Sequence, residues 1–95
     1  VEVAVWEAPA PVKSCDVARA LADAPPGELL RAKGVFAGPD GQSTAVHLAG
    51  RRIDVEARPG AEISGRLVLV GRPGWDRAGI LALLDRAVRE CATPS

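Results

Sequence analysis

The sequence predicts an α+β fold, a two-layer sandwich in which two helices cover one face of a mainly antiparallel sheet of four to five strands (β-α-β-β-β-β-α). Leu67 to Val70 is a short run that is apolar on both faces, which is typical of a central strand. An apolar stripe at helical spacing follows Asp76. Residues 29–57 alternate between apolar and polar side chains, as antiparallel strands do when one face meets water.

The first strand and the first helix are both short. Residues 1–6 place a valine at each of positions 1, 3 and 5, which predicts a strand with one strongly apolar face. Pro9 and Pro11 end that strand. A helix over residues 15–23 is expected next, with Ser14 as its N-cap.

Residues 29–37 form the second predicted strand, and Gly34 lies inside it. A glycine weakens a strand, so its presence indicates a bulge or the close approach of another group. We expect a helix or Trp6 to pack on the backbone at Gly34. One face of this strand should carry Leu30, Ala32, Gly34 and Phe36, and the other Arg31, Lys33 and Val35.

Two further strands, over residues 43–48 and 51–57, continue the pattern. The turn at residues 38–41 and the reversal at Gly50 separate them from their neighbours. Together with the run that ends at Val70, these strands predict a meander.

The C-terminal part joins the central strand to a helix through a turn that begins at Gly71. Asp76 is the expected N-cap of a helix from Arg77 to about Cys91. Leu69 and Leu84 are the expected core residues of this strand and helix.

Composition limits the classes of function. The 95 residues predict a single domain over residues 1–95, and the 12 basic and 12 acidic side chains cancel. We therefore expect no nucleic-acid or membrane partner. No run approaches the roughly 20 apolar residues of a membrane span, no signal peptide is visible, and two cysteines favour a reducing, cytoplasmic location. From the start at Val1 without a methionine we expect either an excised C-terminal portion of a longer protein or a trimmed chain.

The soft metal ligands of the sequence are few: Cys15, Cys91 and His47. Cys15 opens the first predicted helix and Cys91 closes the last, so antiparallel helices would bring them together. They are either two unrelated small core residues or a disulfide or soft-metal pair. His47 is a structural residue or a catalytic or metal-binding one, and no CxxC or HxxxH pair accompanies it.

A partner-binding patch is the other candidate site. Arg31 and Lys33 point the same way along one predicted strand, and Arg52 and Glu56 share the polar face of another. These four residues could recognise a partner protein or simply form a solvated face of the sheet.

Motifs for catalysis are missing from the sequence. It contains neither GxxxxGK[ST] nor GxGxxG, and Asp76 would oppose an anion at the last helix. No nucleophile, base and orienting acid can be assembled, so we expect no catalytic residue.

Several motifs, in the correct order, resemble one family. Leu30 to Phe36 (LRAKGVF) resembles a strand of the C-terminal domain of CobW-type proteins. His47 to Gly50 resembles that domain's strand ending in glycine. Leu67 to Gly71, followed by Asp76 and a leucine-rich helix, resembles its ending, so Gly34, Gly71 and Asp76 are the expected structural residues.

The resemblance implies a non-catalytic role for this domain. In that family the domain follows a P-loop GTPase domain of proteins implicated in cobalt or zinc handling, so zinc or cobalt would belong to the full-length protein. Here the resemblance implies an accessory domain that contacts a GTPase domain of the same or another chain, and it leaves client metalloproteins and self-association open. The alternative is a stand-alone regulatory module that binds a small ligand or a metal.

Overall fold

The computed structural model describes residues 1–9, 11–25 and 27–92, and the side chains of residues 90–92 are outside this description. The order of elements agrees with the predicted α+β fold. The elements are β1 (Glu2–Glu7), α1 (Ser14–Ala22), β2 (Leu29–Ala37), β3 (Ser43–Ala49), β4 (Arg52–Ala57), β5 (Arg66–Gly71) and α2 (Arg77–Ala92).

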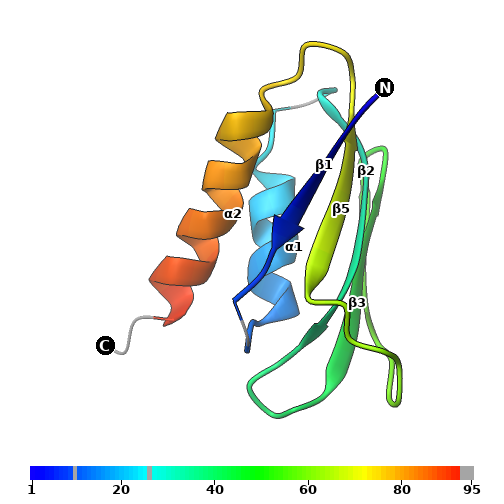
Figure 1. Cartoon of the computed structure of the whole chain (residues 1–95), viewed down its shortest axis with the longest axis vertical. Helices are drawn as coiled ribbons and strands as arrows, with labels where there is room; N and C mark the ends of the chain where they lie inside the picture. The colour runs from blue at the N-terminus through cyan, green and yellow to red at the C-terminus, as the bar shows by residue number, and fades with distance from the viewer. Residues whose placement is uncertain (10, 26, 93–95) are drawn as a thin grey trace.

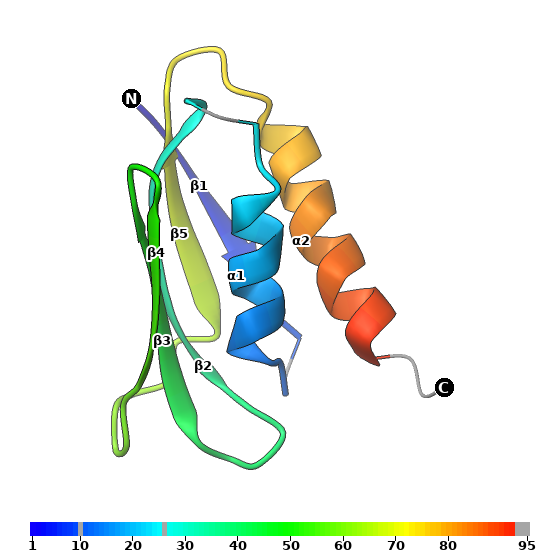
Figure 2. The ribbon, with the colours of Figure 1, turned by 180° about the vertical axis from the view of Figure 1, so that it is seen from behind.

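The five strands form one antiparallel sheet in the order β1-β5-β2-β3-β4. Both helices lie side by side on the same face of this sheet, as predicted (Figures 1 and 2). Strand β5 is an interior strand with a neighbour on each side, as its doubly apolar sequence indicated, and it pairs with β1 and β2.

The predicted meander is only partly correct, because it breaks after β4. Strands β2, β3 and β4 are consecutive neighbours, but β5 lies beyond β2 and not beside β4. The connecting segment runs past β3 and β2 and is held by their backbones. Arg58 N–H donates to Ser43 O at 2.9 Å, and Gly65 N–H donates to Val35 O at 3.1 Å. These long-range bonds satisfy the segment's backbone groups in place of a hairpin.

The core lies between the sheet and the helices. Its fully buried members come from β2, β3, β5 and both helices, which explains how so few aromatic residues suffice. The largest are Phe36, Leu67, Leu69, Ile80, Leu84, Val17 and Val46. The prediction that Leu69 and Leu84 are core residues is confirmed, since neither is exposed.

Strand β1 turns its valines away from this core. Ala4 and Trp6 are buried, whereas Val3 and Val5 are about half exposed, at 55% and 51%. Trp6 has more apolar area to bury than a valine, and its ring packs edge-on against Phe36 with centroids 6.3 Å apart. The strongly apolar face predicted for this strand therefore faces outward.

Two glycines make room for aromatic rings. A Cβ at Gly34 would collide with the backbone O of Arg66 and would lie 2.8 Å from Cζ of Phe36. The predicted close approach is confirmed, but these nearest neighbours are Phe36 and strand β5 and not a helix or Trp6. At Gly71 a Cβ would collide with the indole ring of Trp75.

Of the two predicted helix N-caps, Asp76 is confirmed and Ser14 is wrong. Asp76 caps α2, because its Oδ1 accepts a hydrogen bond of 3.1 Å from Gly79 N–H. Ser14 does not cap α1. It is the first helical residue, Lys13 occupies the N-cap without a side-chain bond, and the buried Ser14 Oγ has no described partner.

Candidate docking surface on the outer face of the sheet

The face of the sheet that points away from the helices, here called the outer face, is covered by neither helix (Figures 1 and 2). Two antiparallel pairs place four valines together on it: Val3 opposite Val70, and Val5 opposite Val68. We call these four residues the valine block. Three of them are about half exposed, with Val68 at 43%, and Val70 is more buried.

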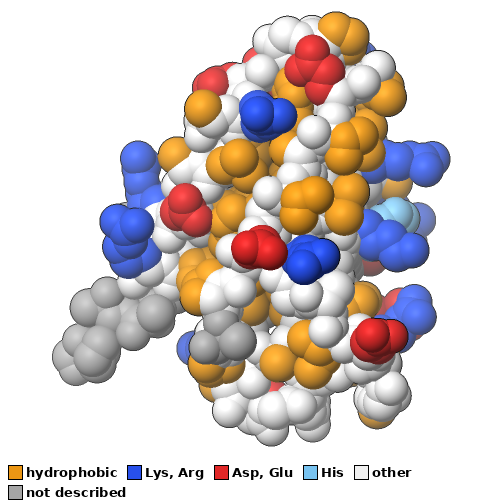
Figure 3. All heavy atoms as spheres, in the orientation of Figure 1, with side chains coloured by type: hydrophobic (Ala, Val, Ile, Leu, Met, Phe, Trp, Pro, Cys, Tyr) orange, Lys and Arg blue, Asp and Glu red, His pale blue; other side chains and the backbone are white. Residues whose placement is uncertain are grey.

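Charged residues occupy the other half of the outer face, over β2, β3 and β4. The pairing places Lys33 beside His47, and His47 beside Asp54, in one row across three strands. In Figure 3 blue side chains and the histidine gather along the right-hand edge, where Figure 1 places this face.

A groove of about 680 Å³ runs through this charged half. Its floor includes Ala45, whose small side chain lies between Val35 and Glu56 of the neighbouring strands. Ala61, in the segment between β4 and β5, forms part of its wall. The charged side chains that line the groove are Lys33, Arg52, Asp54, Glu56 and Arg58, and His47 lies among them.

The ion pairs in this region join residues that are two positions apart in the sequence, and they are exposed to solvent. Arg52 Nε lies 3.2 Å from Asp54 Oδ2, and Arg58 Nη2 lies 3.2 Å from Glu56 Oε2. All four side chains are at least half exposed, so each pair contributes little to stability. Such pairs can exchange partners when another surface arrives, which suits recognition better than folding.

The structure brings the four predicted partner-binding residues onto one face. Lys33, Arg52 and Glu56 line the charged groove. Arg31 lies on the same strand two residues before Lys33 and is also exposed. Whether these residues bind a partner stays a prediction.

The valine block was missed as a site in the sequence. Alternating valines usually mark the face that enters the core, so the signal was present but indicated burial. The distinguishing clue is Trp6, which lies on the opposite face of the same strand and fills the core there.

The three predicted metal ligands are not brought together by the described residues. Cys15 is exposed on α1, and His47 is exposed on the outer face, so the sheet separates them. The first turn of α1 and the last turn of α2 do lie at the same end of the molecule (Figure 1), but the side chain of Cys91 is outside the described residues. Within the described part, no three His, Cys, Asp or Glu residues cluster as metal ligands would.

Comparison with known proteins shows which family this fold and sequence represent. Residues 1–88 match the family described as the cobalamin synthesis protein cobW C-terminal domain. The match spans nearly the whole chain, so this chain belongs to that family, as the sequence motifs indicated. No curated protein matches it.

Two solved structures share the fold. One is described as the Zn(II)-bound YjiA GTPase from E. coli, with a TM-score of 0.63 and 24% identity over 90% of this chain. The other is described as a Zn(II)-bound triple mutant of YjiA GTPase, with the same TM-score of 0.63 and 22% identity over 90% of this chain. The chain spans only 29% of the length of each.

In residues 1–9, 11–25 and 27–92, no helix has the length and apolar character needed to cross a membrane.

Proposed function

We propose that this chain is a non-catalytic accessory domain of a CobW-type GTPase, and that its outer face docks onto the GTPase domain. The family assignment supports the first part, and the solved relatives that share the fold are GTPases more than three times as long. The observation that carries the second part is the valine block, which leaves four adjacent valines on an otherwise ordinary surface.

The outer face has the composition of a transient interface. Contiguous exposed apolar surface on a small domain usually marks a protein contact. Protein interfaces commonly combine an apolar centre with a polar rim. Here the valine block would form the centre, and the charged groove with Arg31 and Lys33 would provide the rim.

A GTPase domain suits this face better than a nucleic acid or a membrane. The chain has no net charge, and the groove mixes both signs, with Asp54 and Glu56 beside Arg52 and Arg58. A polyanion requires a basic footprint. A protein surface with its own mixed charges can match both signs.

The same proposal places the chemistry outside this chain. GTP hydrolysis, and the handling of zinc or cobalt by the full-length cytoplasmic protein, would belong to the GTPase domain. We expect purified chain to hydrolyse no GTP above background, because its sequence lacks the phosphate loop. Hydrolysis that copurifies with the chain and survives further purification would contradict this.

The docking test is a binding titration between this chain and the GTPase domain of a CobW-type protein, prepared as a separate chain. Isothermal calorimetry should detect a complex. The double variant Val5→Lys, Val68→Lys should weaken it by at least about tenfold, since two charges would enter the apolar centre. Circular dichroism would establish that the variant keeps its fold.

Val55→Lys is the matched control. Val55 is also an exposed strand valine, at 46%, but it lies on the helix side of β4. It should leave the affinity unchanged. Equal loss with both variants, or no complex at all, would contradict docking through the outer face. Self-association lost with the double variant would instead assign the face to a second copy.

A further inference from the structure

The two helices do not cover the whole sheet, and the helix layer ends at the side formed by β3 and β4. Helix α1 contacts both β3 and β4, yet Val55 on the helix side of β4 remains 46% exposed. At this margin a cavity of about 380 Å³ opens between the C-terminal end of α1 and the β3–β4 turn. We call it the helix-side cavity.

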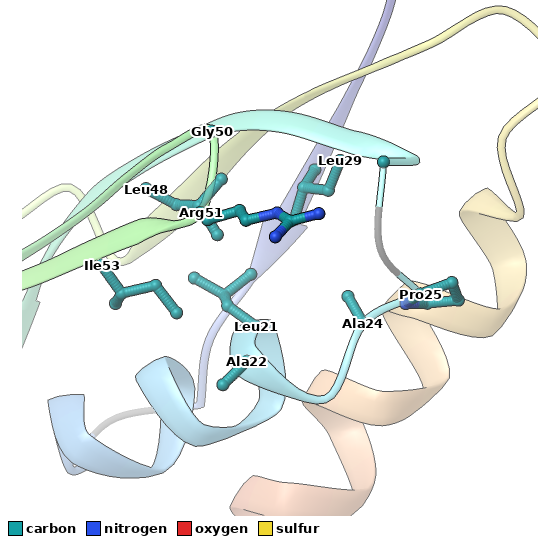
Figure 4. Close-up of a pocket in the computed structure, with 10 residues that line it drawn as sticks. Leu21, Ala22, Ala24, Pro25, Leu29, Leu48, Gly50, Arg51 and Ile53 are labelled. Carbon is teal, nitrogen blue, oxygen red and sulfur yellow. The ribbon is translucent and has the colours of Figure 1, made fainter.

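The walls of the helix-side cavity are apolar and come from three parts of the chain. Leu21 reaches in from α1, Leu48 and Ile53 from β3 and β4, and Ala24 and Pro25 from the segment after the helix (Figure 4). Leu21 and Leu48 are buried, and Ile53 is half-buried. Most of the cavity wall is therefore apolar, which suits the binding of an apolar group.

In the part of the chain that the structure describes, one charged side chain lines this cavity. Arg51, at the β3–β4 turn, extends its guanidinium across the space between Leu29 and Pro25 (Figure 4). Among the described residues no carboxylate or other acceptor pairs with it, whereas the neighbouring Arg52 is paired with Asp54. Arg51 is an exposed residue, so its guanidinium N–H groups are free to donate to an anionic partner that lies beside the apolar walls.

We propose that the helix-side cavity binds a small organic carboxylate with an apolar tail, and that Arg51 holds its carboxylate. The tail would fill the space among Leu21, Leu48 and Ile53, and the fork of the guanidinium matches two carboxylate oxygens. A phosphate fits less well, because a single cation faces apolar side chains. The proposal is independent of docking, since this cavity lies on the other side of the sheet from the valine block.

The test is an NMR titration of the ¹⁵N-labelled chain with hexanoate into the millimolar range, with sodium chloride added in parallel to correct for ionic strength. Amide shifts at Leu21, Ala24 and Ile53 should saturate. Hexanol, which has the same tail without the charge, should bind about tenfold more weakly.

Three variants separate the role of the Arg51 charge from the role of the cavity space. Arg51→Gln should weaken hexanoate about tenfold and leave hexanol unchanged. Arg86→Gln, a matched change at an exposed arginine of α2, should have no effect. Ala24→Phe should fill the cavity and abolish binding of both compounds while Arg51 remains.

Several results would overturn the proposal. They are shifts that never saturate, hexanoate and hexanol of equal affinity, or hexanoate binding that survives Arg51→Gln. Saturating shifts confined to residues outside the cavity would also overturn it.

Discussion

The indole Nε1–H of Trp6 donates a hydrogen bond of 2.9 Å to Oδ1 of Asp85, joining the first strand to the last helix across 79 positions of sequence. Strand β1 is an edge strand that pairs only with β5. The bond therefore gives β1 a second attachment, to the helix layer. Together with the packing of the Trp6 ring on Phe36, it holds the Trp6 face of β1 toward the core and leaves the valine block outside.

A double-mutant cycle measures this bond. Trp6→Phe and Asp85→Ala should each destabilise the chain, and their coupling free energy should be about 1 kcal/mol, the usual net value of such a bond. Urea unfolding followed by circular dichroism would give the four free energies of unfolding. The same cycle with Arg86→Ala should show no coupling. A coupling near zero for Trp6 and Asp85 would mean that the bond does not hold β1.

Gly71→Ala should destabilise the chain by about 1–3 kcal/mol, because the new methyl group would collide with the ring of Trp75. In a Trp75→Ala background the ring is gone, so the same change should cost much less. Thermal unfolding of the four variants checks this. A cost that is equal in both backgrounds would show that the backbone of Gly71, and not the ring, sets the requirement for glycine.

Gly34→Val should also destabilise, by about 1–3 kcal/mol, although valine has the higher strand propensity. The new side chain would meet the Phe36 ring and the backbone of β5. Lys33→Ala, at the adjacent exposed position, should stay within about 0.5 kcal/mol of the parent. A rise in melting temperature for Gly34→Val would contradict the close packing seen at this position.

Leu69→Ala and Leu84→Ala should each cost about 2–5 kcal/mol, since both side chains are fully buried between the central strand and the last helix. Chemical denaturation gives the values. A loss below about 1 kcal/mol for either would be inconsistent with its place in the core.

Much of the fold could be predicted because its strands and helices follow from local sequence patterns and from single capping residues. The alternation predicted the faces of β2 correctly from Arg31 to Phe36, whereas a register shift between Leu29 and Arg31 buries Leu29 more fully than Leu30. Asp76 predicted the start of α2 correctly. The apolar run of β5 predicted a central strand because both of its pleat faces are hydrophobic.

The remaining features depend on contacts between distant segments. The position of β5 beside β2 requires the connection held at Ser43 and Val35, which leaves no periodic signal. Each face of β1 carries apolar side chains, so the bond to Asp85 and the packing on Phe36 decide which face enters the core. For the same reason the valine block could not be identified as exposed.

Docking through the outer face is tested most directly by the valine methyl groups themselves. In ¹³C-methyl spectra of valine-labelled chain, adding the CobW-type GTPase domain should shift or broaden Val3, Val5, Val68 and Val70. The buried core valines should keep their positions: Val17 of α1, Val46 of β3 and Val88 of α2. Perturbation of the buried or helix-side valines alone, with the valine block unchanged at saturation, would contradict the account.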